Sequence, residues 1–136
     1  VRANRKTRKG VGLRKRILVV DDDPSIRFLL RLIFESAGYQ VTEAQHGLAA
    51  LIHIRDAIPD LVVTDMMMPV MDGGELIKHL RSEPHTSGLP ILAVTANPRS
   101  REAAENADAV LPKPFDRSEL LARVSMLLAA ETAQAV

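Results

Sequence analysis

Short, uninterrupted runs of apolar residues alternate along this chain with longer stretches in which apolar residues recur every three or four positions. Three of the short runs, at 17–20, 61–63 and 91–94, contain no polar residue. Such runs are typical of strands that a parallel sheet buries on both faces. The run at 39–43 alternates instead, and the run at 109–111 is very short and stops at a proline. We therefore expect these last two runs to be strands at the edges of the sheet.

The helix predicted after the first strand has a legible start and end. Asp23 is a suitable N-cap, and Pro24 fits the first helical position. Gly38 can adopt the left-handed conformation that ends a helix. The apolar residues between them follow the spacing of one helical face: Ile26, Leu29, Leu30 and Ile33.

The last predicted helix starts at Asp116 and runs to about residue 130. Asp116 and Glu119 have the spacing of a capping box, and the following apolar residues share one face. Further helices are predicted over 48–55, 76–81 and 99–105. The helix at 99–105 is short, and Asn106 is a candidate for the residue just beyond its end because asparagine tolerates positive φ.

Five strand–helix units in a row predict an open parallel sheet with helices on both faces. This is the doubly wound α/β class, in which crossover connections are right-handed. Ligands of such sheets bind beyond the carboxyl ends of the strands. Any functional site is therefore expected at that edge.

Length and composition are consistent with a single globular domain. The chain has 136 residues, of which 46% are hydrophobic and 26% charged, enough to bury one core. It contains no cysteine, which excludes disulfides, zinc–thiolate sites, iron–sulfur clusters and a cysteine nucleophile. No segment has the apolar length of a membrane span or an export signal. We expect a cytoplasmic protein.

The net charge of +1 combines two very different regions. Residues 1–16 hold eight of the 18 cations and no acid, so ten cations face all 17 acids from residue 17 onward. We expect a disordered basic tail at 1–16, a folded domain at 17–130 and a short C-terminal tail at 131–136. Basic tails can contact nucleic acid or an acidic membrane surface, but this one lacks aromatic residues, so neither partner is expected.

Chemically active side chains gather at the predicted carboxyl edge of the sheet. Asp21 and Asp22 follow the first strand, Asp65 follows the third, Thr95 ends the fourth and Lys113 follows the fifth. Three carboxylates in contact would repel one another by a few kcal/mol per pair, about 4 kcal/mol at ~4 Å and an effective dielectric of about 20. A cation must therefore share this site.

Lysine and a divalent ion can supply that positive charge. Carboxylates, a main-chain carbonyl and water suit Mg²⁺, or Mn²⁺ as an alternative, because hard cations prefer oxygen ligands. The Thr95 hydroxyl and the Lys113 ammonium would complete a site for a phosphoryl group. Asp65 is then the natural nucleophile, since a carboxylate can attack phosphorus to form an acyl phosphate.

Four stretches in this order resemble the response-regulator receiver (CheY-like) domain of two-component signalling. They are ILVVDDDPSIR at 17–27, LVVTDMMMPVMDG at 61–73, ILAVTAN at 91–97 and VLPKPF at 110–115. The resemblance implies a flavodoxin-like sheet with strand order 2-1-3-4-5. It also implies a single-domain signalling protein if the chain is complete, rather than an enzyme with turnover.

The resemblance further implies a role for each site residue. Asp65 corresponds to the phosphoacceptor, Thr95 to the switch hydroxyl and Lys113 to the lysine that pairs with the phosphoryl group. The implied Mg²⁺ ligands are Asp22, Asp65 and the main-chain carbonyl of Met67, with Asp21 beside them or bound through water. The implied partners are a sensor histidine kinase or phosphotransfer protein and a downstream protein. The Lys113–Pro114 bond is often cis in this family.

Two departures from the family pattern lie on the surface that usually reports phosphorylation. Val110 stands where most members have Tyr or Phe, so an aromatic rotation coupled to Thr95 is not available. The interval from Thr95 to Lys113 is 18 residues, about one helical turn (roughly 3.6 residues) shorter than usual, which predicts a short fourth helix.

Other functions remain open at this point. A module that interacts without phosphorylation would fit the unusual reporting surface. Asp21 and Asp23 imitate the acid pair of a haloacid-dehalogenase-like phosphatase, although Asp65 would then have no role. The methionines near Asp65 are expected to pack rather than to bind copper, and the four histidines are expected to be exposed or to cap helices.

Overall fold

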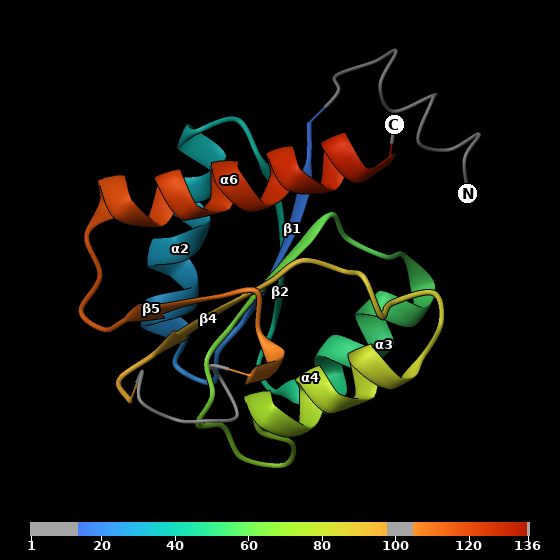
Figure 1. Cartoon of the computed structure of the whole chain (residues 1–136). Coiled ribbons are helices and arrows are strands. Elements are labelled where there is room, and N and C mark those ends of the chain that lie inside the picture. Colours follow the sequence, from blue (N-terminus) through green and yellow to red (C-terminus); the bar gives the residue numbers. More distant parts are fainter. Residues whose placement is uncertain (1–13, 98–104, 136) are drawn as a thin grey trace.

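The computed structural model describes residues 14–97 and 105–135, and it shows one parallel sheet covered by helices on both faces (Figure 1). The strands lie in the order β2-β1-β3-β4-β5, and all pairs are parallel. Their bounds are β1 Arg16–Val20, β2 Gln40–Ala44, β3 Leu61–Thr64, β4 Ile91–Thr95 and β5 Ala109–Pro112. The predicted fold class, strand order and edge strands are confirmed.

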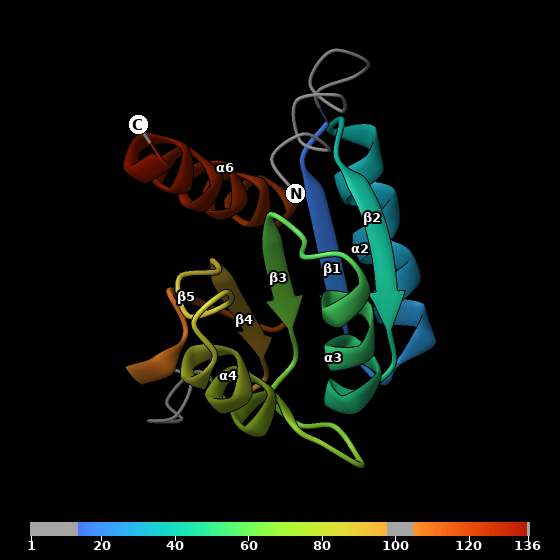
Figure 2. The same cartoon turned by 90° about the vertical axis from the view of Figure 1, so that its right-hand side faces the viewer.

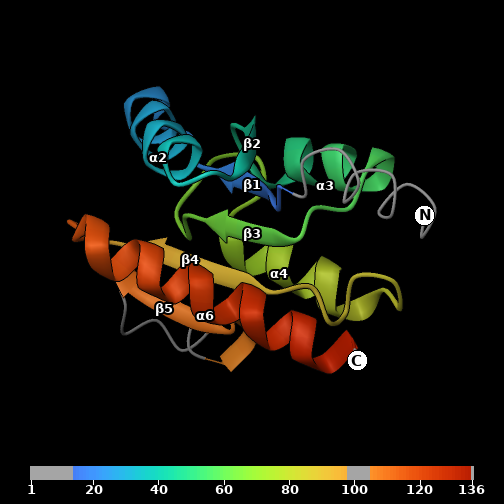
Figure 3. The same ribbon diagram turned by 90° about the horizontal axis from the view of Figure 1, so that it is seen from above.

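Helices of the described part of the chain cover both faces of the sheet (Figures 1 and 2). Their bounds are α2 Pro24–Ser36, α3 Gly47–Asp56, α4 Gly73–Ser82 and α6 Arg117–Ala135. Helices α2 and α6 pack on one face, with α2 beside β1 and β2 and α6 beside β3 and β4 (Figure 3). Helices α3 and α4 cover the other face. No helix among the described residues is long and apolar enough to cross a bilayer.

Each face of the sheet has its own hydrophobic core because strand side chains alternate between the two faces. Ile17 and Val19 of β1 pack with α2 and α6, where Phe34 is fully buried. Leu18 and Val20 of the same strand pack with α3 and α4. Every residue of β3 and β4 is buried, as the uninterrupted apolar runs predicted.

The start of α2 agrees with the sequence prediction, whereas α4 begins several residues before the predicted position. Asp23 caps α2 by accepting a hydrogen bond from the main-chain N–H of Ser25. Gly38 has a positive φ of 97° just after that helix. Helix α4 starts at Gly73, ahead of the predicted residue 76, because Asp72 and Glu75 form a reciprocal capping box there.

The last helix and the short helix before β5 also differ from the prediction. Asp116 accepts a hydrogen bond from Glu119 N–H at 3.2 Å at the start of α6. Helix α6 continues to Ala135, so the prediction of a separate tail at 131–136 is wrong for 131–135. Strand β1 begins at Arg16, so the prediction of a disordered tail at 1–16 is wrong for that residue. Most of the helix predicted at 99–105 lies outside the described residues. Asn106, expected just beyond that helix, is still helical.

Candidate phosphoacceptor site

The first acidic residues of the site lie in the turn between β1 and α2. The Asp21 main-chain N–H donates to Ala44 O at 3.1 Å, which ties the turn to the end of β2. The Asp21 side chain is buried, and its Oδ1 accepts a hydrogen bond from Asp23 N–H at 2.9 Å. The Asp22 side chain, in contrast, is exposed. The turn therefore presents one buried and one solvent-facing carboxylate.

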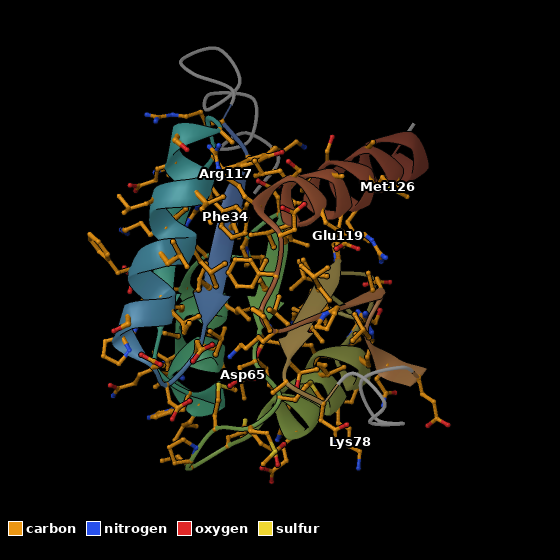
Figure 4. The ribbon with its side chains drawn as sticks, turned by 90° about the vertical axis from the view of Figure 1, so that its left-hand side faces the viewer. Phe34, Asp65, Lys78, Arg117, Glu119 and Met126 are labelled. Atoms are coloured by element: carbon orange, nitrogen blue, oxygen red, sulfur yellow. The ribbon has the colours of Figure 1, made fainter. Side chains whose placement is uncertain are left out.

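Asp65 follows β3 and lies below the tip of β1 (Figure 4). Its main-chain N–H donates to Val20 O at 2.9 Å, which continues the pairing of β1 with β3. Its Oδ1 accepts from Met66 N–H at 2.8 Å, and its main-chain oxygen accepts from the buried Thr64 hydroxyl at 2.8 Å. The residue is 8% exposed, so its carboxylate is held by the fold rather than by water.

Lys113 joins the two buried carboxylates. Its Nζ lies 3.0 Å from Asp21 Oδ2 and 3.5 Å from Asp65 Oδ2. Its main-chain N–H donates to Thr95 O at 3.0 Å, which extends the pairing of β4 with β5 by one residue. The Lys113–Pro114 bond is cis, as the resemblance implied. Residues 92 positions apart in the sequence are thus in direct contact.

The electrostatics show a site with too little positive charge of its own. Burial raises the pKa of Asp65 above its ordinary 3.8; Lys113 opposes that rise and the Asp21 carboxylate adds to it. Burial works to lower the pKa of Lys113, but its contacts with Asp21 and Asp65 outweigh burial and raise that pKa above 10.5. Charged Asp65 is therefore destabilised while charged Lys113 is stabilised.

The carboxylates fit a small divalent cation. One oxygen from each of Asp21, Asp22 and Asp65 lies within 4.8 Å of the others. These three oxygen ligands match the preference of Mg²⁺ and Mn²⁺ over that of softer metals. Three carboxylates facing one ammonium leave a negative surplus that a divalent ion would neutralise.

Thr95 and Met67 complete the set of predicted site residues. Thr95 is buried at the end of β4, between β3 and β5, and its hydroxyl accepts a hydrogen bond from Asn97 N–H at 3.1 Å. The Met67 main-chain N–H helps to lower the pKa of Asp65, and its side chain is 74% exposed. The structure thus brings Asp21, Asp22, Asp65 and Lys113 together directly and places Thr95 on the neighbouring strand end.

Two contributors to the site were not anticipated from the sequence. The Arg27 guanidinium donates to Asp21 O at 2.7 Å, and no local pattern indicates that contact. Gly73 lies so close to Asp65 that a Cβ at position 73 would come within 2.3 Å of Asp65 O. The second could have been suspected from Asp72-Gly73 at a helix start, where a small residue permits a close approach.

The remaining predictions near the site concern methionines, a histidine and Val110. Met66 is buried in the core on the α3–α4 face, as expected for a packing methionine. His46 caps α3 by accepting a hydrogen bond from Ala49 N–H at 3.1 Å, as expected for a capping histidine. Val110 is partly buried against the core on the α3–α4 face.

Comparison with known proteins agrees with this geometry. Residues 17–125 match the response regulator receiver domain family. Response regulator MprA of Mycobacterium sp. is 47% identical over 83% of this chain and 50% of its own length. Phosphate regulon transcriptional regulatory protein PhoB of Rhizobium meliloti is 38% identical over 83% of this chain and 52% of its own. The chain spans about half the length of these curated relatives.

Solved structures show the same likeness. The chemotaxis response regulator CheY4 of Vibrio cholerae superposes with a TM-score of 0.78 and 33% identity, over 84% of this chain and 98% of that one. A CheY-like receiver domain protein of Methanospirillum hungatei gives 0.82 and 29%, over 89% and 98%. The chain therefore belongs to the response regulator receiver domain family of two-component signalling.

Proposed function

We propose that Asp65 is the phosphoacceptor of this receiver domain. The observation that carries the proposal is its place in the site: a buried carboxylate in contact with Lys113 and within 4.8 Å of the ligand atoms of Asp21 and Asp22. Its Oδ1 accepts from Met66 N–H at 2.8 Å, while its Oδ2 lies 3.5 Å from Lys113 Nζ. Oδ2 is the oxygen we expect to attack.

The proposed reaction transfers a phosphoryl group from a phosphohistidine. Asp65 Oδ2 forms a bond to phosphorus while the phosphorus–nitrogen bond breaks, and the imidazole leaves with the bonding electron pair and takes up a proton. The product is an acyl phosphate on Asp65. Lys113 would pair with a phosphoryl oxygen, and the Thr95 hydroxyl, which accepts a hydrogen bond from Asn97 N–H, would donate its own hydrogen to another.

Mg²⁺, or Mn²⁺ in its place, would be held by Asp22, Asp65 and the main-chain oxygen of Met67, with Asp21 bound directly or through water. When bound, this ion supplies positive charge that stabilises the phosphoryl oxygens in the transition state. The surplus of carboxylates over cations supports this assignment.

The proposal extends to the partners and the setting. The phosphodonor is a sensor histidine kinase or phosphotransfer protein, and a further protein reads the altered surface. The domain acts in the cytoplasm and has no turnover beyond its own phosphorylation and dephosphorylation. The basic residues 1–16 are not assigned to nucleic acid or membrane binding.

Intact-mass measurement tests the proposal. The full chain is incubated with acetyl phosphate and Mg²⁺, and a single phosphoryl adduct is expected. Asp65→Asn should abolish the adduct because the amide is a poor nucleophile. Asp23→Asn is the matched control: it removes a neighbouring acid yet keeps the helix cap, so its adduct should equal that of the wild type. An adduct on Asp65→Asn would refute the proposal.

A second candidate is an interaction module that does not use phosphorylation, and Val110 favours it because the usual aromatic reporter is missing. Amide exchange of residues 95–111, measured with and without a phosphate mimic such as beryllofluoride, separates the two. Unchanged protection favours the second candidate.

The family match favours a receiver over a haloacid-dehalogenase-like phosphatase. Turnover of p-nitrophenyl phosphate that is lost in Asp21→Asn but kept in Asp65→Asn would reverse that choice.

A further inference from the structure

Arg27 connects the edge strand β2 to the acidic turn after β1. Its Nη1 donates to the main-chain oxygen of Asp21 at 2.7 Å, and its Nε donates to Glu43 Oε1 of β2 at 3.0 Å. The Arg27 side chain is 17% exposed, so it is held within the protein rather than extended into water. A guanidinium can serve both contacts at once because its donors form a rigid planar fork.

The Asp21 oxygen belongs to the peptide that joins Asp21 to Asp22. The Asp21 N–H donates to Ala44 O, and Asp21 Oδ1 accepts a hydrogen bond from Asp23 N–H. The bond from Arg27 therefore holds the main-chain oxygen of Asp21, in addition to the bonds made by its N–H and its side chain. Arg27 bonds a main-chain oxygen and therefore uses no carboxylate oxygen of Asp21 or Asp22. Lys113, in contrast, lies 3.0 Å from the carboxylate oxygen Asp21 Oδ2.

Asp22 depends on this backbone more than the other acids do. Its carboxylate is exposed and has no hydrogen bond or ion pair with any residue that the structure describes. Asp21 and Asp65, by comparison, are each held through their side chains. The direction of the Asp22 side chain is thus set by the peptide that Arg27 holds.

Glu43 keeps Arg27 in place and is itself held from a second side. Its Oε2 lies 3.3 Å from Arg31 Nε, one helical turn further along α2. Arg31 also donates both Nη groups to Val41 O at 3.2 Å. Arg31 shares the network and the helix but bonds β2 rather than the turn that carries Asp21 and Asp22.

We propose that Arg27 is a positioning residue for the cation site: it fixes the Asp21–Asp22 peptide that aims the Asp22 carboxylate, and Glu43 fixes Arg27 in turn. This inference rests on the proposed function only in assigning a divalent cation to the site. Residues that orient metal ligands typically change metal affinity about 10- to 100-fold when they are lost.

Isothermal titration with Mg²⁺ alone, on the unphosphorylated full chain, tests the inference. Arg27→Met keeps most of the apolar stem and removes the donors, and it should weaken Mg²⁺ binding by about 10-fold. Arg31→Met is the matched control and should bind Mg²⁺ as the wild type does. Arg27→Lys should recover part of the loss, because the ammonium can still donate to Asp21 O. Equal affinities for Arg27→Met and Arg31→Met would overturn the inference.

Two further measurements keep the result decisive. If Arg27→Met does not fold, Glu43→Gln replaces it; this variant keeps Arg27 but loosens its hold, so a smaller weakening of Mg²⁺ binding is expected and unchanged affinity would overturn the inference. With acetyl phosphate, Arg27→Met should need more Mg²⁺ for half-maximal adduct formation but reach the wild-type rate at saturation. A wild type that forms no adduct refutes the phosphoacceptor role alone, because the comparison of Mg²⁺ affinities is unaffected.

Discussion

The two edges of the sheet balance their charged side chains in opposite ways. At the amino edge, Arg81 of α4 pairs with Asp108 at 2.8 Å and donates to main-chain oxygens of the loops before β4 and β5. Asp108 also accepts from Ile91 N–H at 2.7 Å. At the carboxyl edge, the Lys113 ammonium contacts the Asp21 and Asp65 carboxylates, and the Asp22 carboxylate lies beside them with no ion pair among the described residues. The amino edge is built for stability, whereas the carboxyl edge retains a surplus of negative charge that only a ligand can balance.

The largest expected effect comes from removing the lysine of the carboxyl edge. Lys113→Met leaves the Asp21 and Asp65 carboxylates buried without a cation, which should destabilise the protein by about 3 kcal/mol. Urea unfolding measures the loss, and added Mg²⁺ should restore part of it because the ion replaces the missing charge. A loss that Mg²⁺ does not reduce would show that the two edges do not differ in this way.

The same variant gives a pH signature. Contacts with Asp21 and Asp65 raise the pKa of Lys113 above 10.5 in the folded protein. The stability they provide is therefore complete below 10.5 and is lost as the pH rises through the folded pKa. The difference between wild type and Lys113→Met should shrink over that alkaline range.

The corresponding change at the amino edge should be smaller and should not respond to metal. Arg81→Met removes an ion pair and several hydrogen bonds at a side chain that is 24% exposed, at an expected cost of about 2 kcal/mol. Urea unfolding should give the same cost with and without Mg²⁺. A Mg²⁺-dependent cost would link the amino edge to the site.

Neutralising the acceptor should stabilise the protein slightly when no divalent ion is present. Asp65→Asn removes one of the crowded carboxylates, for a gain on the order of 1 kcal/mol. Burial raises the pKa of Asp65 in the folded protein, so the unfolded chain ionises first and the wild type loses stability as the pH rises through that folded pKa. The advantage of Asp65→Asn should therefore grow from about the ordinary pKa of 3.8 upward and then level off.

Mg²⁺ provides the control for that experiment. Because the proposed cation site includes the Asp65 carboxylate, adding Mg²⁺ should stabilise the wild type and leave Asp65→Asn nearly unchanged. An Asn variant that is less stable than the wild type in chelator at neutral pH would contradict the idea of surplus negative charge.

The smallest expected effect concerns backbone conformation. Among the described residues, two have a positive φ: Gly38 at the amino edge, where glycine tolerates it, and Val70 in the loop after β3, with φ 69°. A β-branched residue is disfavoured there by about 1–2 kcal/mol. Val70 is 72% exposed, so Val70→Asn loses little packing and should raise stability by somewhat less than about 1 kcal/mol. Thermal unfolding measures the gain, and Met126→Asn, at an equally exposed helical position, should give none.

How far the sequence predicts this molecule depends on how local each signal is. The buried strands were predictable because a short, uninterrupted apolar run, such as residues 61–63, is typical of a strand covered on both faces. The meeting of Asp21, Asp65 and Lys113 was also predictable, since the carboxyl ends of parallel strands share one edge. The resemblance to receiver domains then assigned each residue a role.

Contacts that depend on a distant partner were not predictable in the same way. In the sequence, Arg27 occupies a polar position of the helix that could equally well face solvent. Only the packing of α2 against β2 brings its guanidinium to Glu43 and to Asp21 O. The start of α4 was predicted late because Gly73 and Gly74 are poor helix formers that hide the signal of the capping box. The end of α6 was placed too early because residues 131–135 lack an apolar periodicity, although alanine-rich segments favour helix.

The close approaches of two glycines give this domain an uneven tolerance to mutation. A Cβ on Gly73 would come within 2.3 Å of Asp65 O, and one on Gly47 within 2.7 Å of Met71 Cγ and 2.8 Å of Met71 O. These positions are the starts of α4 and α3, and both lie against the segment 65–71 that contains Asp65. In a saturation library selected for signalling, neither position carries any chemistry, yet both should accept glycine alone, and even alanine should be depleted as strongly as a change at Asp65.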